Sequence, residues 1–153
     1  MTHAATSMTY EFFALTDKGR VRTNNEDAIT FDTDAQIAIL ADGMGGYNAG
    51  EVASGMSTTF IRTEMARWVS QADTTLQSTD VRRALEICVE NANHAILGAS
   101  LSNPQYAGMG TTLVVAVFHG SRLILGHIGD SRCYRLRNGS VQQITRDHSW
   151  LQE

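Results

Sequence analysis

The 153-residue chain lacks three features that would assign it to particular classes of protein. It has no disulfide framework, because its two cysteines, Cys88 and Cys133, lie far apart and form no CxxC pair. No apolar run approaches the roughly 18 residues typical of a membrane-spanning helix. The N-terminus has neither the basic region nor the apolar core of a secretory signal. We therefore expect a cytoplasmic protein that does not span a membrane.

Basic residues and proline are also scarce. The net charge is −4, the 12 basic residues include one lysine, Lys18, and the arginines are scattered without a long basic run. Nucleic acid and membrane surfaces are therefore not expected partners. A single proline and an apolar fraction of 42% argue against a disordered linker and predict one globular domain over residues 1–153.

Two segments have the periodicity of helices. Apolar residues recur at steps of three to five residues over 50–71 and 80–97, and Asp80 is a candidate N-cap for the second segment. Alternating or continuous apolar residues predict strands elsewhere. The expected strands are 10–15, 28–31, 37–41, 111–119, 123–128, 132–137 and 141–145. The order of elements predicts an α+β fold, in which the helical pair covers one face of a mostly antiparallel sheet.

Short turn signals support the strand assignments in the second half. Asn138-Gly139 between two strands is typical of a type I′ hairpin, because that turn needs positive φ at both central positions. His119-Gly120 is a weaker signal for an earlier turn.

The stretch 39–51, ILADGMGGYNAGE, joins an apolar strand to a helix through an acid and several glycines. Two nucleotide-binding loops do not fit it. Gly45 and Gly50 have the spacing of a P-loop, but Glu51 follows where that loop needs a lysine, and a negative charge there would repel a nucleotide. Asn48 occupies the third glycine position of GxGxxG. The glycines therefore need a different explanation.

Carboxylates stand at the ends of the predicted strands. Glu26 and Asp27 begin one strand, Asp42 ends another, and Asp130 lies in a turn between two more. Together with a glycine carbonyl, such oxygen ligands suit Mg²⁺ or Mn²⁺, whereas no His–Cys cluster at ligand spacing favours zinc. Taken singly, each aspartate also fits a turn cap, and spacing alone does not decide whether the fold brings the acids together.

Two arginines precede these acids. Arg22 lies five residues before Asp27 and is a candidate for a bidentate contact to a phosphate group near a metal ion. Arg20 would serve this role as well.

Five segments in order resemble the motifs of one family. They are TDKGRVRTNNEDA, ILADGMGGYNAGEVAS, MGTTLVVAV, HIGDSRCYRLRNG and ITRDHS, and they cover most of the chain from residue 16 to residue 149. Together they are similar to the metal-dependent protein serine/threonine phosphatases of the PP2C-like (PPM) family, in the bacterial form with DGMGG. The resemblance implies a four-layer αββα sandwich of two antiparallel sheets flanked by helices, of which this chain would hold the N-terminal part.

The resemblance also implies a reaction and a metal centre. The reaction is hydrolysis of phosphoserine and phosphothreonine in proteins modified by a serine/threonine kinase, with two Mn²⁺ or Mg²⁺ ions activating a water molecule. By matching motif, Asp42 would bridge both ions and the Gly43 carbonyl would bind one of them. Glu26 and Asp27 would hold ligand waters or bind at the edge of the site, and Asp130 would serve a third ion.

The same resemblance assigns the substrate phosphate to Arg22 and shows two departures. Met44 stands where many eukaryotic relatives have a histidine that is a candidate general acid, so water or another group would protonate the leaving alkoxide. The family's later motifs, an SDGL-like segment and a final segment containing DN, each supply a metal carboxylate and are not found here. We therefore expect an incomplete domain that folds poorly and is a weak phosphatase by itself.

Two other functions stay open at this point. Loss of metal ligands would also fit a non-catalytic phosphoprotein-binding or regulatory pseudophosphatase. A stress-response phosphatase of the anti-anti-sigma switching type is a related alternative, although that group usually carries a sensory domain.

Overall fold

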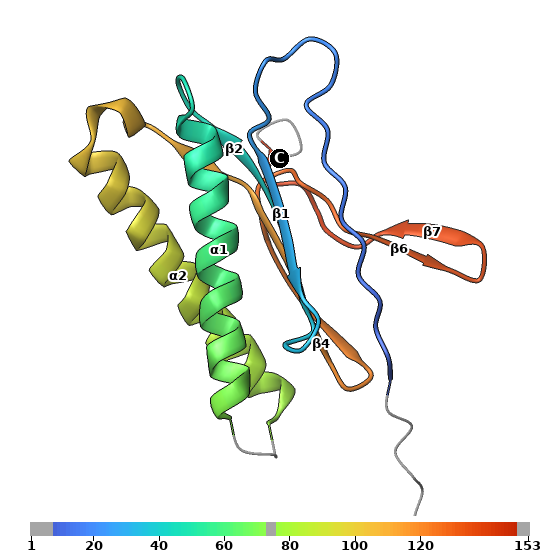
Figure 1. Cartoon of the computed structure of the whole chain (residues 1–153). Helices are drawn as coiled ribbons and strands as arrows, with labels where there is room; N and C mark the ends of the chain where they lie inside the picture. Colours follow the sequence, from blue (N-terminus) through green and yellow to red (C-terminus); the bar gives the residue numbers. More distant parts are fainter. Residues whose placement is uncertain (1–7, 73–75, 150–153) are drawn as a thin grey trace, which may run out of the picture.

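The computed structural model describes residues 8–72 and 76–149 and confirms the α+β class. Its elements, in chain order, are β1 (Asp27–Asp32), β2 (Ile37–Met44), α1 (Ala49–Gln71), α2 (Ser78–Ser102), the short 3₁₀ helix η1 (Pro104–Tyr106), β3 (Gly110–Thr111), β4 (Leu113–His119), β5 (Arg122–Ile128), β6 (Tyr134–Arg137) and β7 (Ser140–Gln143). Both long helices cover the same face of the sheet (Figure 1). No helix in the described ranges is long and apolar enough to cross a bilayer.

Every strand pair is antiparallel. The main sheet has the order β1-β2-β4-β5, β3 pairs with the end of β2, and β6 and β7 form a separate two-stranded sheet. The β6–β7 hairpin projects from the main sheet on the side away from the helices (Figure 1). Of the four layers that the family resemblance implies, the described residues thus form one helical layer and the sheet beneath it, plus this hairpin.

The core lies between the helices and the sheet. Alternation along β2 buries Ile37, Ile39 and Ala41 completely or almost completely, as expected for a strand covered on one face. Helix α2 buries most of the predicted apolar stripe, namely Val81, Ala84, Leu85, Cys88 and Ala92, while the last predicted member, Ile96, is half-buried. Helix α1 differs from the prediction, because most of its buried positions are small residues: Ala49, Gly50, Ala53, Ser54, Ser57, Thr58, Ile61 and Met65. Small side chains let this helix approach the sheet closely.

Two sequence predictions about local structure are wrong. Helix α2 begins at Ser78, so Asp80 is not its N-cap; its carboxylate instead accepts a hydrogen bond from the main-chain N–H of Gln77 at 2.9 Å. Residues 10–15 form no strand, although they run along the sheet on the face opposite the helices (Figure 1). Aromatic packing holds this segment there: the ring of Phe12 stacks on Phe31 with centroids 5.6 Å apart.

The predicted hairpin turn is confirmed. Asn138 and Gly139 join β6 to β7 with φ of 51° and 74°, as a type I′ turn requires. Gly120, in the tight turn between β4 and β5, also has a positive φ of 59°.

Candidate metal centre

Two carboxylates face each other at one end of the main sheet. Asp27 on β1 is the direct cross-strand partner of Asp42 on β2. Partial burial raises the pKa of Asp42. This pKa is raised further by the negative charge of Asp27, by a hydrogen bond between the two side chains, and by the charges of Asp130 and Glu26. The fold therefore brings the other three predicted acids within electrostatic reach of Asp42. Like charges directly opposite in a sheet are destabilising, so the arrangement calls for a functional explanation.

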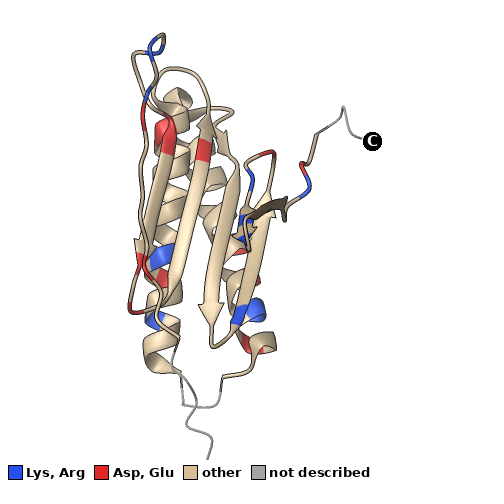
Figure 2. Ribbon diagram, turned by 90° about the vertical axis from the view of Figure 1, so that its right-hand side faces the viewer, with Lys and Arg blue, Asp and Glu red and all other residues tan. Residues whose placement is uncertain are grey.

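A cavity of about 550 Å³ opens at this end of the sheet, and Arg22, Glu26, Asp27, Asp42 and Gly43 all contribute to its lining. The Nη1 atom of Arg22 lies 3.6 Å from Oε2 of Glu26. The arginine side chain is 75% exposed, whereas that of Glu26 is 18% exposed. Acidic segments of the strands lie near the same end as the loop that carries the N-terminal basic residues (Figure 2). The predicted phosphate-binding residue and four predicted metal ligands thus share one space.

The base of this cavity is fixed by hydrogen bonds to the carbonyl oxygen of Glu26. The main-chain N–H of Gly43 donates to it at 3.1 Å, and the hydroxyl of Ser54 on α1 donates to it at 2.6 Å. A Cβ at Gly43 would lie 1.9 Å from the carbonyl oxygen of Gly50 in the first turn of α1. Gly43 is therefore a glycine because the helix packs directly against it.

Thr112, between β3 and β4, connects two of the acids. Its main-chain N–H donates to the carbonyl of Asp42 at 2.9 Å, and its hydroxyl accepts from the N–H of Asp42 at 3.0 Å. The same hydroxyl lies 2.6 Å from the hydroxyl of Ser131, the residue after Asp130. Gly129, with φ of 95°, packs against the Thr112 side chain. Thr112 and Ser131 belong to motif segments recognised in the sequence, but their roles are visible only in the structure.

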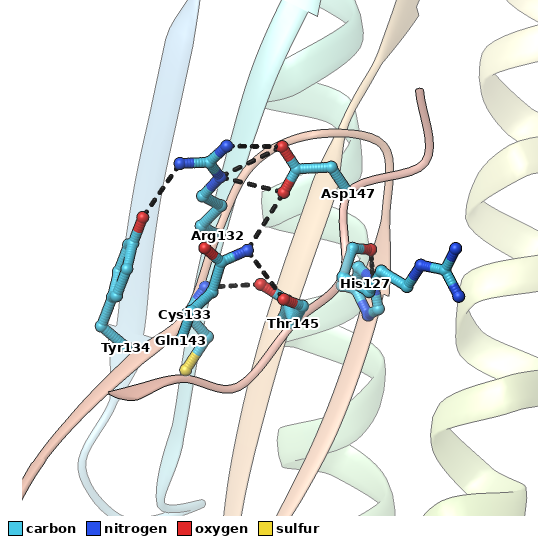
Figure 3. Close-up of polar contacts among 8 residues, drawn as sticks. His127, Arg132, Cys133, Tyr134, Gln143, Thr145 and Asp147 are labelled. Carbon is cyan, nitrogen blue, oxygen red and sulfur yellow. Dashed lines mark hydrogen bonds and ion pairs between the residues drawn. The ribbon is translucent and has the colours of Figure 1, made fainter. Parts of the chain in front are cut away.

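A second network of polar contacts, centred on Arg132 and Asp147, lies next in the chain to the turn that carries Asp130 (Figure 3). The guanidinium of Arg132 donates to both carboxylate oxygens of Asp147, from Nε to Oδ1 at 2.9 Å and from Nη2 to Oδ2 at 2.7 Å. This bidentate contact lowers the pKa of Asp147 and raises that of Arg132. The N–H of His148 also donates to the carbonyl of Gly129 at 3.0 Å. The segment after β7 therefore fixes the turn from outside the main sheet.

The donor atoms suit a hard divalent cation. The carboxylates of Glu26, Asp27, Asp42 and Asp130 and the carbonyl of Gly43 offer oxygen alone, which is the preference of Mg²⁺ and Mn²⁺. Within residues 8–72 and 76–149, no group of three or more His, Cys, Asp or Glu side chains is gathered closely enough to hold an ion. The residues therefore fit such an ion as a partial ligand set, with the opposed pair Asp27 and Asp42 at its centre.

The cysteines do not offer an alternative centre of reaction. Cys88 and Cys133 are both free. Burial raises the pKa of each thiol, which disfavours the thiolate that a cysteine nucleophile needs. The chemistry of this site therefore rests on its oxygen ligands and on Arg22.

Comparisons with known proteins agree on one family. The sequence profile of protein phosphatase 2C matches residues 17–151. The serine/threonine protein phosphatase PstP of Mycobacterium tuberculosis is 39% identical over 149 residues, which is 97% of this chain and 27% of PstP. The serine/threonine phosphatase stp of Listeria monocytogenes is 38% identical over 141 residues, which is 90% of this chain and 54% of stp.

The fold matches a solved structure of the same kind. The catalytic domain of the serine/threonine protein phosphatase PstP in complex with two manganese ions has a TM-score of 0.72 and 41% identity. The match covers 89% of this chain and 55% of that one. The chain thus spans about half of that catalytic domain and of the Listeria relative, and a smaller share of full-length PstP.

Proposed function

The chain belongs to the protein phosphatase 2C family, and from this premise we propose that it acts in the metal-dependent hydrolysis of phosphoserine and phosphothreonine in proteins. The observation that carries the proposal is the direct opposition of Asp27 and Asp42 in a cavity that Arg22 also lines. Cations beside this pair would remove the repulsion that raises the pKa of Asp42, and an arginine beside them suits a phosphate group.

The proposed roles follow from the positions of the side chains. Asp42 is the central ligand, Asp27 and Glu26 flank it, and Gly43 adds a neutral carbonyl oxygen. When bound, Mn²⁺ or Mg²⁺ supplies the positive charge that acidifies an attacking water molecule and offsets the charge of the phosphoryl group. Thr112 keeps the backbone of Asp42 in place through its two main-chain hydrogen bonds.

Two further residues act at the edge of the site. Asp130 lies within electrostatic reach of Asp42 and is the proposed ligand of a third ion. Arg22 binds the phosphate oxygens of the substrate, and its exposed side chain can meet a phosphate on a protein surface. The proposed substrates are phosphorylated cytoplasmic proteins, modified by a serine/threonine kinase. The names of the relatives, serine/threonine protein phosphatases, support this substrate class.

Phosphate release from a phosphoserine peptide in the presence of Mn²⁺ tests the proposal. We expect release that depends on Mn²⁺, that is lost in Asp42→Ala and that falls strongly in Arg22→Ala. Asp34→Ala is a matched control, because Asp34 lies in the turn between β1 and β2, at the opposite end of this strand pair from Asp27 and Asp42. Equal release by wild type and Asp42→Ala would refute the proposed role of the carboxylates.

A second function, binding of phosphoproteins without hydrolysis, is favoured by one observation. In the described part of the chain no three potential ligand side chains are already gathered around one point. Metal titration separates the two functions. Phosphopeptide binding that is indifferent to Mn²⁺ and to Asp42→Ala, without phosphate release, would identify a binding protein.

A further inference from the structure

Tyr47, in the loop between β2 and α1, combines an unfavourable backbone with an exposed ring. Its φ is 54°, in the left-handed region that residues with a side chain rarely adopt. Its side chain is 96% exposed, so packing of the ring contributes little to the fold. A strained and exposed aromatic residue three positions after Met44 therefore has no structural explanation in the described part of the chain, and strain of this kind is common at binding sites.

Tyr47 lines two open cavities, one of which adjoins the candidate metal centre. The first, of about 470 Å³, is lined by Tyr47 together with Arg22, Glu26 and Gly45, and these last three also line the acidic cavity. The second, of about 850 Å³, is also lined by Tyr47 and extends to η1. The first of these cavities, which we call the arginine cavity, therefore adjoins the acidic cavity through Arg22, Glu26 and Gly45, and it adjoins the second space through Tyr47.

The second space, which we call the η1 groove, differs chemically from the acidic cavity. Every residue that lines it is uncharged, and Ala49, Val52, Pro104 and Tyr106 contribute apolar surface. Tyr106 packs against the small cluster of buried residues between α1 and the chain before β3. An ion or a phosphate would find no charged partner in this groove, whereas an apolar or aromatic side chain would bury surface there.

A hydrogen bond joins the loop that carries Arg22 to the η1 groove. The side chain of Asn24, in the loop that carries Arg22, donates to the side chain of Asn48 at 2.9 Å. Asn48 lines the η1 groove and is the residue before α1. The proposed phosphate-binding loop and the groove are therefore fixed relative to each other by this hydrogen bond, so one ligand can use both.

We propose that Tyr47 and the η1 groove bind an apolar or aromatic side chain of the phosphoprotein substrate, close in sequence to the phosphorylated residue held by Arg22. This inference rests on the proposed phosphatase or phosphoprotein-binding function and adds a source of sequence preference to it. The Tyr47 ring offers a flat apolar surface at the point where the substrate chain passes from the arginine cavity to the groove.

Binding of two peptides, each with a non-hydrolysable phosphonate analogue in place of phosphoserine, to the 153-residue chain in millimolar Mg²⁺ tests the inference. The peptides differ only in the residues that flank this analogue, which are leucine and phenylalanine in one and glycine in the other. By fluorescence anisotropy, we expect the apolar peptide to bind about five- to tenfold more tightly. Tyr47→Ala and Tyr106→Ala should remove this preference, and Tyr47→Phe should keep it. Leu136→Ala removes a similarly exposed apolar side chain from β6 and should change nothing.

The outcomes distinguish this inference from the function on which it rests. Arg22→Ala should weaken both peptides equally, because it acts on the phosphate alone. If neither peptide binds to the wild type, the proposed function and the inference both fail. If both bind but the preference is absent, or persists unchanged in Tyr47→Ala and Tyr106→Ala, the η1 groove is not the subsite. Since Tyr47 is exposed, circular dichroism should show unchanged helix content in its variants.

Discussion

Thr112 holds Asp42 through both of the aspartate's main-chain polar groups. Its hydroxyl accepts the N–H of Asp42 at 3.0 Å, while its own N–H donates to the Asp42 carbonyl at 2.9 Å. The hydroxyl is also 2.6 Å from that of Ser131, beside Asp130. One side chain therefore sets the position of two candidate metal ligands that are far apart in the sequence.

Thr112→Val should weaken metal binding without removing any ligand. The substitution leaves the N–H of Asp42 without its acceptor, so we expect about tenfold weaker Mn²⁺ binding by electron paramagnetic resonance and a loss of about 1–2 kcal/mol in the free energy of unfolding. Thr112→Ser keeps the hydroxyl and should restore most of the affinity. Wild-type affinity in Thr112→Val would show that this contact does not position Asp42.

Asp42→Asn should stabilise the metal-free chain near neutral pH. The fold raises the pKa of Asp42 above 3.8, so the folded chain binds this proton more tightly than the unfolded chain does. The resulting stability is fully present below pH 3.8 and is lost as the pH rises through the folded-state pKa. Because the site is open to solvent, we expect a gain below about 1 kcal/mol in Asp42→Asn.

Urea unfolding with a chelator, near neutral pH and below pH 3.8, measures this effect. The difference between Asp42→Asn and wild type should shrink at the acidic pH. Added Mn²⁺ should stabilise the wild type and leave Asp42→Asn unchanged. A variant less stable than the wild type near neutral pH in chelator would contradict the like-charge argument, and Asp34→Asn serves as the control for loss of an exposed acid.

Gly43→Ala should disrupt the contact between α1 and the end of β2. The added Cβ would lie 1.9 Å from the carbonyl oxygen of Gly50, so backbone must move. We expect a loss of about 2–3 kcal/mol in the free energy of unfolding, together with weaker metal binding. Gly46→Ala is the matched control, because a Cβ there meets nothing within 4 Å. Equal stability of the two variants would show that α1 does not need this close approach.

Loss of the Arg132–Asp147 contact should reduce stability in a pH-dependent way. Hydrogen bonding from Arg132 lowers the pKa of Asp147 below 3.8. The stability that this contact contributes is therefore fully present above pH 3.8 and is lost as the pH falls through the folded-state pKa of Asp147. Arg132→Ala should be destabilised relative to wild type near neutral pH, and the difference should shrink in acid. Arg82→Ala, which removes the exposed pair with Glu86, should have little effect at either pH.

Local signals in the sequence predicted most of the elements correctly. The apolar stripe of α2 and the Asn138-Gly139 turn both depend on residues close together in the chain, and both are confirmed. The strand predicted over residues 10–15 failed because β-forming residues make a strand only where another strand pairs with them. The aromatic residues of that segment pack on the sheet instead.

For the site, the sequence predicted residue types but not their arrangement. Strand ends pointed to Asp27 and Asp42 as oxygen ligands, but only the register of β1 and β2 makes them direct partners. The roles of Thr112 and Ser131 depend on contacts between segments far apart in the chain. Tyr47 gave no signal in the sequence, because its unusual backbone and its place in the lining of two cavities are properties of the fold.

The two hydrogen bonds to the carbonyl of Glu26 have a consequence for how the site can move. Through Gly43 and Ser54 they couple the start of β1, the end of β2 and the first part of α1 into one rigid unit. Because a hydrogen bond from Asn24 also ties the loop that carries Arg22 to this unit, adjustment to ligands of different bulk would fall to the exposed side chain of Arg22. The spacing of the carboxylates would stay constant while the arginine adapts.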